Sequence, residues 1–295
     1  MDVFRTPDER FDHLPGFPWE PRYREWEGLR LAHVDEGGGR PVVLFHGEPS
    51  WSFLYRKIIA VLLARGYRCI APDLPGFGRS DKPTDVGWYT YDRHTAAAAS
   101  LIEELDLQDA VFVVQDWGGP VGLRIGALEQ PERVSRFVAM DTGLFTGRQH
   151  MSEGWFAFRN FVERTEDLPI GMLVKNACVS ELPDEVIAAY EAPFPTAESK
   201  AGARAFPLIL PLKPDDPGAD AGQRTAEALR ADERPALLMW ADSDPALPLD
   251  PVGRTVQTLF PTAEELTVIH DAGHFLQEDQ GREIGALIAD WLENT

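Results

Sequence analysis

Short apolar runs alternate with longer amphipathic stretches along most of this chain. Runs rich in Val, Ile, Leu and Phe predict buried strands, and a weaker alternation near the N-terminus predicts an edge strand. The strands are expected at residues 29–34 (the edge strand), 41–45, 67–72, 111–114, 136–140, 236–240 and 265–270. Apolar residues spaced three and four apart predict helices at residues 52–65, 92–106, 118–129, 250–259 and at the C-terminus. This alternation indicates parallel βαβ units in a three-layer α/β sandwich.

Two segments depart from the alternation. Residues 1–28 are rich in proline and aromatic residues, which predicts an extended arm on the surface. Residues 143–228 hold helical segments and many prolines but no convincing strand, which indicates a helical insertion above the carboxyl edge of the sheet. We therefore expect a first part of an α/β core at 1–142, a helical cap at 143–228 and a second part of the core at 229–295.

Composition and charge exclude several classes of partner. The 295-residue chain is 44% hydrophobic, enough for a large core, and its formal net charge is −20. Nucleic acids and anionic membranes need a basic face, so neither is an expected partner. No apolar run reaches the ~18 residues that span a bilayer, and the N-terminus lacks the pattern of a signal peptide. Cys69 and Cys178 form neither a disulfide framework nor a zinc cluster. We expect a monomeric, cytoplasmic protein without metal or cofactor.

The strongest local motif follows the predicted strand at 111–114. That strand runs into Gln115-Asp-Trp-Gly-Gly119 and then into a helix. A strand, a glycine-rich turn and a helix with a reactive side chain at the apex form a nucleophile elbow, and here the apex residue is Asp116. Gly118 and Gly119 remove side chains that would collide where strand and helix approach each other. The alternative is an ordinary strand-to-helix turn with a helix-capping aspartate.

Polar residues also follow the other predicted strands. In open α/β sheets, sites gather at the carboxyl ends of the strands. Asp116, Asp244 and His274 occur in the chain order nucleophile, acid, histidine, which is typical of hydrolases with this elbow. Asp141, at the end of another strand, is an alternative acid.

Four segments carry a resemblance to a known family. They are His46-Gly-Glu-Pro-Ser-Trp-Ser-Phe-Leu-Tyr-Arg-Lys57, Gly76-Phe-Gly-Arg-Ser-Asp-Lys-Pro83, Val114-Gln-Asp-Trp-Gly-Gly119 and Asp271-Ala-Gly-His-Phe-Leu-Gln-Glu278. Over nearly its whole length the chain resembles the haloalkane dehalogenases, in particular the branch with His-Gly-Glu-Pro, a late catalytic aspartate and two halide-binding tryptophans. The resemblance implies an α/β-hydrolase fold with a mostly parallel sheet and an inserted cap. It also implies hydrolysis of a small haloalkane by water to alcohol and halide.

The chemistry of such a site assigns a role to each residue. A carboxylate is already ionised, so Asp116 would displace halide from a saturated carbon and form an alkyl ester. His274 would activate water to hydrolyse the ester, and Asp244 would orient the imidazole. The resemblance implies an oxyanion hole made of the backbone N–H groups of Glu48 and Trp117. The Glu48 side chain has two open interpretations, holding the hydrolytic water or forming a structural salt bridge.

A departing halide needs hydrogen-bond donors in an apolar pocket, and an indole N–H is such a donor. Trp117, beside the nucleophile, is the first expected donor, and Trp155 in the cap is the second. The resemblance implies that Phe158 falls at the family's usual tryptophan position, with Trp155 one helical turn earlier on the same face. Phe156, Phe158 and Phe161 are expected to line the pocket or the cap core.

Other readings of the sequence remain open. An epoxide hydrolase has the same aspartate nucleophile but uses cap tyrosines, and this cap has only Tyr190. A fluoroacetate-type dehalogenase has arginine after the nucleophile, where this chain has Trp117. A coelenterazine-type luciferase shares the Gln-Asp-Trp-Gly elbow. A non-catalytic, ligand-binding α/β-hydrolase typically lacks a member of the triad, and none is missing here.

Overall fold

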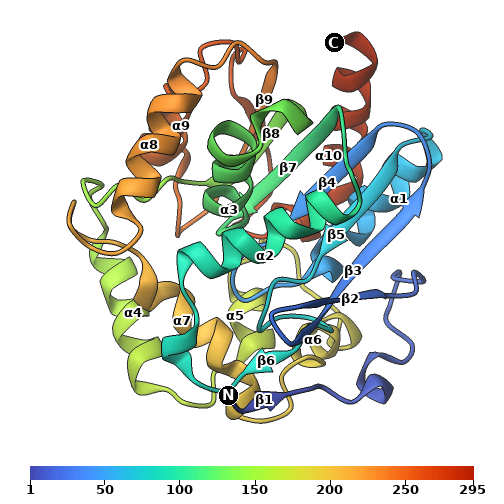
Figure 1. Cartoon of the computed structure of the whole chain (residues 1–295), viewed down its shortest axis with the longest axis vertical. Coiled ribbons are helices and arrows are strands. Elements are labelled where there is room, and N and C mark those ends of the chain that lie inside the picture. Colours follow the sequence, from blue (N-terminus) through green and yellow to red (C-terminus); the bar gives the residue numbers. More distant parts are fainter.

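The computed structural model describes all residues 1–295 and is built on one eight-stranded sheet. The strand order is β10-β9-β8-β7-β4-β5-β3-β2; β4, β5 and β7–β10 are parallel, whereas β2 and β3 are antiparallel to their neighbours. The mostly parallel sheet flanked by helices that the sequence predicts is confirmed (Figure 1). The strands are β2 (Arg22–Trp26), β3 (Leu29–Gly37), β4 (Pro41–Phe45), β5 (Arg68–Pro72), β7 (Ala110–Asp116), β8 (Val134–Thr142), β9 (Ala236–Ala241) and β10 (Thr267–Ile269).

The N-terminal region differs from the sequence-based expectation in two respects. The predicted edge strand, β3, lies inside the sheet between β5 and β2, and β2 forms the edge. The segment predicted to be a surface arm therefore contributes a strand, and its Phe11 and Phe17 are buried. A two-residue connection, Glu27-Gly28, joins β2 to β3 with positive φ at both residues, as tight hairpin turns require.

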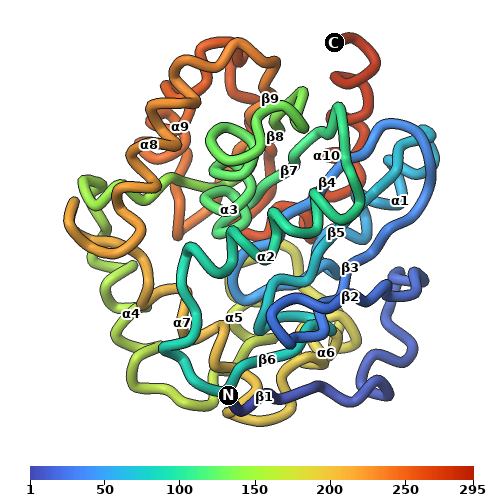
Figure 2. Tube along the Cα trace, in the orientation of Figure 1, coloured from blue at the N-terminus to red at the C-terminus, as the bar shows by residue number.

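The N-terminus reaches the segment between β8 (Val134–Thr142) and β9 (Ala236–Ala241). β1 (Val3–Phe4) pairs with β6 (Lys82–Pro83), and the Thr6 hydroxyl donates to the carbonyl oxygen of Pro193 at 2.7 Å. In Figure 2 the dark-blue N-terminal trace runs beside the yellow trace of this region. The N-terminal segment is therefore joined both to β6 and to the segment between β8 and β9.

Helices cover both faces of the sheet. Figure 1 shows α2 and α3 in front of the strands and α10 behind them. α1 and α10 pack against each other, and α3 packs against both α2 and α8. The core helices are α1 (Arg56–Ala64), α2 (Tyr91–Glu104), α3 (Gly118–Arg124), α9 (Arg254–Gln257) and α10 (Leu276–Asn294).

Five helices separate β8 from β9. α4 packs against α7 and α5 against α6, at the end of the sheet far from the C-terminus (Figure 1). α8 instead contacts α3 and the π-helical turn Ile125–Glu129 that follows it. The division of the chain at 143–228 stays a prediction, because both α7 and α8 contact elements outside that range. The bounds are α4 (Glu153–Arg164), α5 (Ile170–Asn176), α6 (Asp184–Glu191), α7 (Ala201–Ile209) and α8 (Ala219–Arg230).

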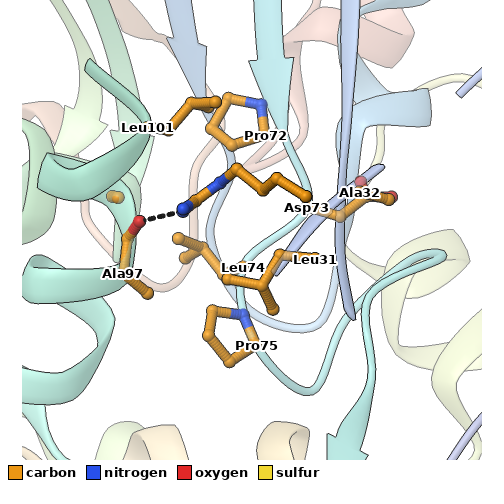
Figure 3. Close-up of a pocket in the computed structure, with 10 residues that line it drawn as sticks. Leu31, Ala32, Pro72, Asp73, Leu74, Pro75, Ala97 and Leu101 are labelled. Atoms are coloured by element: carbon orange, nitrogen blue, oxygen red, sulfur yellow. Dashed lines mark hydrogen bonds between the residues drawn. The ribbon is translucent and has the colours of Figure 1, made fainter. Parts of the chain in front are cut away.

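No helix is long and apolar enough to cross a membrane. A small cavity of about 10 Å³ lies between β3, the end of β5 and α2, where the Arg24 guanidinium donates to the Ala97 carbonyl (Figure 3). Such a volume holds about one water molecule, so this cavity is too small for an organic substrate.

Candidate active site

The turn after β7 has the geometry of a nucleophile elbow. Asp116 ends the strand with φ = +48°, an uncommon conformation for a residue other than glycine, and α3 begins at Gly118. A Cβ atom on Gly118 would lie 2.1 Å from the Phe45 carbonyl oxygen, and one on Gly119 would lie 1.7 Å from Thr142 Oγ1. Glycine is therefore required at both positions for strand and helix to approach this closely.

His274 lies between two carboxylates. Its Nε2 is 3.5 Å from Asp116 Oδ2, and its Nδ1 is 2.8 Å from Asp244 Oδ2. The second oxygen of Asp244 accepts the backbone N–H groups of Ala246 and Leu247 at 2.7 and 3.0 Å. The structure thus brings together the three residues that the sequence singled out as nucleophile, acid and base.

The charges of this trio shift its pKa values. Burial lowers the pKa of His274, but the Asp244 charge and the contacts with Asp116 outweigh it and hold that pKa well above its usual value. Burial would raise the pKa of Asp244, but the neighbouring His274 charge and the accepted hydrogen bonds lower it overall. The Asp244–His274 pair therefore favours the carboxylate and the imidazolium.

The loop after β4 approaches the nucleophile closely. The backbone N–H of Glu48 donates to Asp116 Oδ1 at 2.7 Å. A Cβ atom on Gly47 would lie 2.1 Å from that same oxygen, so only glycine fits there. His46 braces the loop, because its Nε2 accepts from the Leu74 N–H at 3.0 Å while its Nδ1 lies 2.9 Å from the Gly47 carbonyl oxygen.

The Glu48 side chain is buried, its Oε1 has no hydrogen-bond partner, and it forms no ion pair. Burial and the nearby Asp116 charge raise the pKa of Glu48 well above its usual value. A structural salt bridge, one of the two interpretations of this side chain, is absent.

Asp141, the alternative acid, is not the partner of His274. It is fully buried, and its Oδ1 accepts the Ala241 N–H at 2.9 Å while its Oδ2 has no hydrogen-bond partner. Burial and the Asp244 charge raise the pKa of Asp141 well above its usual value. The geometry therefore favours Asp244 as the acid.

Gln115 is a neighbour of the imidazole that the sequence did not single out. Its side chain is fully buried, and its Nε2 donates to the His274 backbone carbonyl at 3.0 Å. The same atom lies 3.4 Å from His274 Nε2. Its position immediately before the nucleophile is the only sequence signal that marks it.

Trp117 is 4% exposed and surrounded by aromatic rings. Phe206 of α7 stacks on it with centroids 4.7 Å apart and planes inclined by 26°, and Phe145 lies at 5.1 Å. Tyr91 of α2 contacts it edge-on at 6.3 Å. Both phenylalanines belong to the segment between β8 and β9, and no local sequence pattern indicated that either reaches the elbow.

The aromatic residues of α4 separate into two groups. Trp155 and Phe158 are half-buried and pack against the core, together with Val162 at helical spacing i, i+3, i+7. Phe156 and Phe161 are each 42% exposed, so neither belongs to the cap core, and their place in a pocket lining stays a prediction. They lie off the buried stripe of the helix. No α4 ring is among the aromatic neighbours of Trp117, and the role expected of Trp155 stays a prediction.

No group of three or more His, Cys, Asp or Glu side chains is arranged to hold a metal ion. Cys69 and Cys178 are both free thiols, the first buried and the second half-buried.

Comparisons with known proteins add independent findings. A family model of the alpha/beta hydrolase fold matches residues 40–280. A haloalkane dehalogenase of Psychrobacter cryohalolentis is 41% identical over 303 residues, covering 100% of this chain and 99% of the relative. One from Mycobacterium marinum is 42% identical, covering 99% of this chain and 100% of the relative. A tetrameric haloalkane dehalogenase from Paraglaciecola agarilytica NO2 superposes with a TM-score of 0.90 at 36% identity, covering 97% of each chain.

Proposed function

This chain belongs to the haloalkane dehalogenases of the α/β-hydrolase fold family, hydrolases that act on carbon–halide bonds, and we propose that it converts haloalkanes to primary alcohols. The proposed reaction proceeds through a covalent ester on Asp116. The observation that carries the proposal is the position of His274, which is 3.5 Å from Asp116 and 2.8 Å from Asp244.

In the first step Asp116 attacks the carbon that bears the halogen. A new O–C bond forms, the C–halogen bond breaks, and its electron pair leaves with the halide. Because Oδ1 accepts the Glu48 N–H at 2.7 Å, Oδ2 is the oxygen left to take the alkyl group. The Asp116 side chain is 17% exposed, so little water competes for its charge.

In the second step His274 Nε2 takes a proton from a water molecule, which attacks the ester carbonyl carbon. Negative charge then develops on Oδ1, and the Glu48 N–H is already aimed at that oxygen. The backbone N–H of Trp117 is the second proposed donor of this oxyanion hole. Collapse of the tetrahedral intermediate releases the alcohol and restores the Asp116 carboxylate.

The halide site is proposed to use the Trp117 indole N–H. Its burial and its aromatic neighbours supply the dry surroundings in which one donor binds an anion strongly. Trp155 is the proposed second donor, and its place on the buried stripe of α4 supports that choice.

The decisive experiment traps the ester. In His274→Phe, halide release should stop after one equivalent and the protein mass should increase by the alkyl group, because the second step lacks its base. The matched control is His270→Phe, since the His270 side chain is 79% exposed and pairs with Asp242 instead. Sustained turnover by His274→Phe would refute the assignment.

Epoxide hydrolysis is the second candidate, and the structure weakens it. Tyr190, the cap tyrosine, donates its hydroxyl to Glu278, which also binds the Arg56 guanidinium at 2.8 Å. A hydroxyl committed to this buried cluster is not free to activate an epoxide oxygen. Diol formation from styrene oxide would favour this candidate, and binding of 1,2-dibromoethane without bromide release would favour a non-catalytic receptor.

A cytoplasmic, monomeric protein remains part of the proposal. The relative from Paraglaciecola agarilytica is tetrameric, so light scattering of the purified protein is the measurement that tests the monomer.

A further inference from the structure

The site gathers four carboxyl groups around one imidazole. Asp116 and Asp244 contact His274 directly, at 3.5 and 2.8 Å. Glu48 and Asp141 are buried nearby, and burial together with the charge of a neighbouring aspartate raises both of their pKa values, which favours their neutral forms. Two negative charges, those of Asp116 and Asp244, therefore act on the ring.

The negative charges of Asp116 and Asp244 repel each other unless the ring between them carries a positive charge. With a neutral imidazole, the buried site would hold two carboxylates and no cation. With an imidazolium, each carboxylate faces an N–H group of the ring. Opposite charges within about 4–6 Å favour the charged form of a group, and the effect grows where water is excluded. The side chains of His274 and Asp244 are only 8% and 0% exposed.

We propose that His274 is an imidazolium in the resting enzyme, and that alkylation of Asp116 itself converts this residue into the neutral base that the second step needs. The inference rests on the proposed ester mechanism. It adds that His274 holds a proton before the reaction and loses it when Asp116 is alkylated.

The proton balance follows from the charges. Alkylation turns the Asp116 carboxylate into a neutral ester and produces one halide ion. Of the two carboxylate charges, only that of Asp244 then acts on the ring, and the proton on Nε2 leaves to solvent along with the halide. Neutral His274 next accepts a proton from water as the ester is hydrolysed. The products of this second step are the alcohol, the Asp116 carboxylate and the imidazolium, so the resting state of the enzyme returns without further proton release.

Asp116 is proposed both to attack the substrate and to stabilise the imidazolium, and its distance from His274 agrees with both roles. A strong charge-assisted N–H to carboxylate bond is about 2.7–2.9 Å long. The 2.8 Å contact with Asp244 is in that range, whereas the 3.5 Å contact with Asp116 is well outside it. The imidazolium thus stabilises the nucleophile's charge without tying up Oδ2 in a short hydrogen bond. The Nδ1 proton is thus held firmly by Asp244, whereas the Nε2 proton, which is the one that leaves, is held loosely by Asp116.

The test is a pH titration of His274 by ¹⁵N NMR on the full chain labelled at histidine, with signals assigned by His274→Gln. Asp116→Asn replaces the carboxylate with a neutral group of the same shape, as esterification does. We expect the wild-type ring to remain an imidazolium at about pH 8, where an ordinary imidazole is neutral. In Asp116→Asn its pKa should fall by about 1–3 pH units.

Asp242→Asn is the matched control, because Asp242 lies two residues before Asp244 but contacts His270 at 3.2 Å. It should leave the His274 titration unchanged. Asp116→Ser removes the same charge by a different side chain and gives an independent comparison if Asp116→Asn folds poorly. A neutral His274 in the wild-type protein at about pH 8, or the same titration with and without the Asp116 charge, would overturn the inference. The alkyl adduct of His274→Phe tests the ester mechanism separately, so the two failures are distinguishable.

Discussion

Phe206 lies face to face with Trp117, with ring centroids 4.7 Å apart and ring planes inclined by 26°. The stack continues on the other side of Phe206, where the ring of His94 is 4.4 Å away, and then to Tyr89 at 5.7 Å. One ring from α7 is thus inserted between the elbow and α2. A residue between β8 and β9 therefore contacts the indole that is the first proposed halide donor.

Phe206→Leu should weaken halide binding, because leucine keeps the pocket apolar but no longer stacks on the indole. An aromatic pair contributes about 0.5–1.5 kcal/mol beyond its buried area, so bromide affinity should fall about 2- to 10-fold. Quenching of tryptophan fluorescence by bromide measures it. Phe156→Leu is the control, since Phe156 is 42% exposed. Equal affinities in the wild type and Phe206→Leu would show that the stack does not position the donor.

The two buried aspartates near the imidazole should respond very differently to the same substitution. Asp244→Asn removes the charge that holds His274 Nδ1 at 2.8 Å and should reduce kcat by about 10³- to 10⁴-fold. Asp141→Asn replaces a group whose neutral form burial already favours, so its kcat should fall less than about 10-fold. Steady-state halide release ranks the two variants, and the reverse order would make Asp141 the catalytic acid.

Trp155→Phe tests the second halide donor. A hydrogen bond to a charged group contributes about 1.5–3 kcal/mol, so loss of the indole N–H should weaken bromide binding about 10- to 100-fold. Phe158→Leu, a change on the same buried stripe of α4, removes no donor and should have a much smaller effect. Unchanged bromide affinity in Trp155→Phe would assign the second donor to another residue.

The sequence predicted best what depends on short segments and on topology. Val42–Phe45 and Val111–Val114 are fully buried, so their apolar runs are unbroken and easily recognised. Asp116, Asp244 and His274 follow strands or lie in loops at one edge of the sheet, and the parallel arrangement brings them together. Three residues far apart in the chain could therefore be grouped before their distances were known.

The features that the sequence did not predict are decided by tertiary packing and not by a local pattern of apolar residues. β2 reads Arg-Tyr-Arg-Glu-Trp, because an edge strand with one exposed face needs no apolar run. Phe206 reaches Trp117 through the way α7 folds back on the core, which no local pattern encodes. Phe156 and Phe161 are as apolar as Phe158, and only the packed orientation of α4 decides which of the three faces inward.

His94 should make the protein less stable at mildly acidic pH. The ring is fully buried, neither nitrogen has a hydrogen-bond partner, and burial lowers its pKa to about 3. An unfolded chain has an ordinary histidine with a pKa of about 6.5, so below that pH the unfolded state binds the extra proton. The contribution of neutral His94 is therefore complete above about pH 6.5 and is lost progressively as the pH falls towards 3.

His94→Phe removes this titration while keeping a flat ring between Tyr89 and Phe206. Glu48 and Asp141, whose pKa values are raised, change stability in the opposite direction, since the neutral forms favoured in the fold cost less as the pH falls. The comparison between the wild type and the variant cancels their effect. Urea unfolding at about pH 7 and about pH 5 should show a loss of stability that is about 2 kcal/mol smaller in His94→Phe than in the wild type. Parallel losses in the two proteins would mean that His94 is already protonated, or solvated, in the native state.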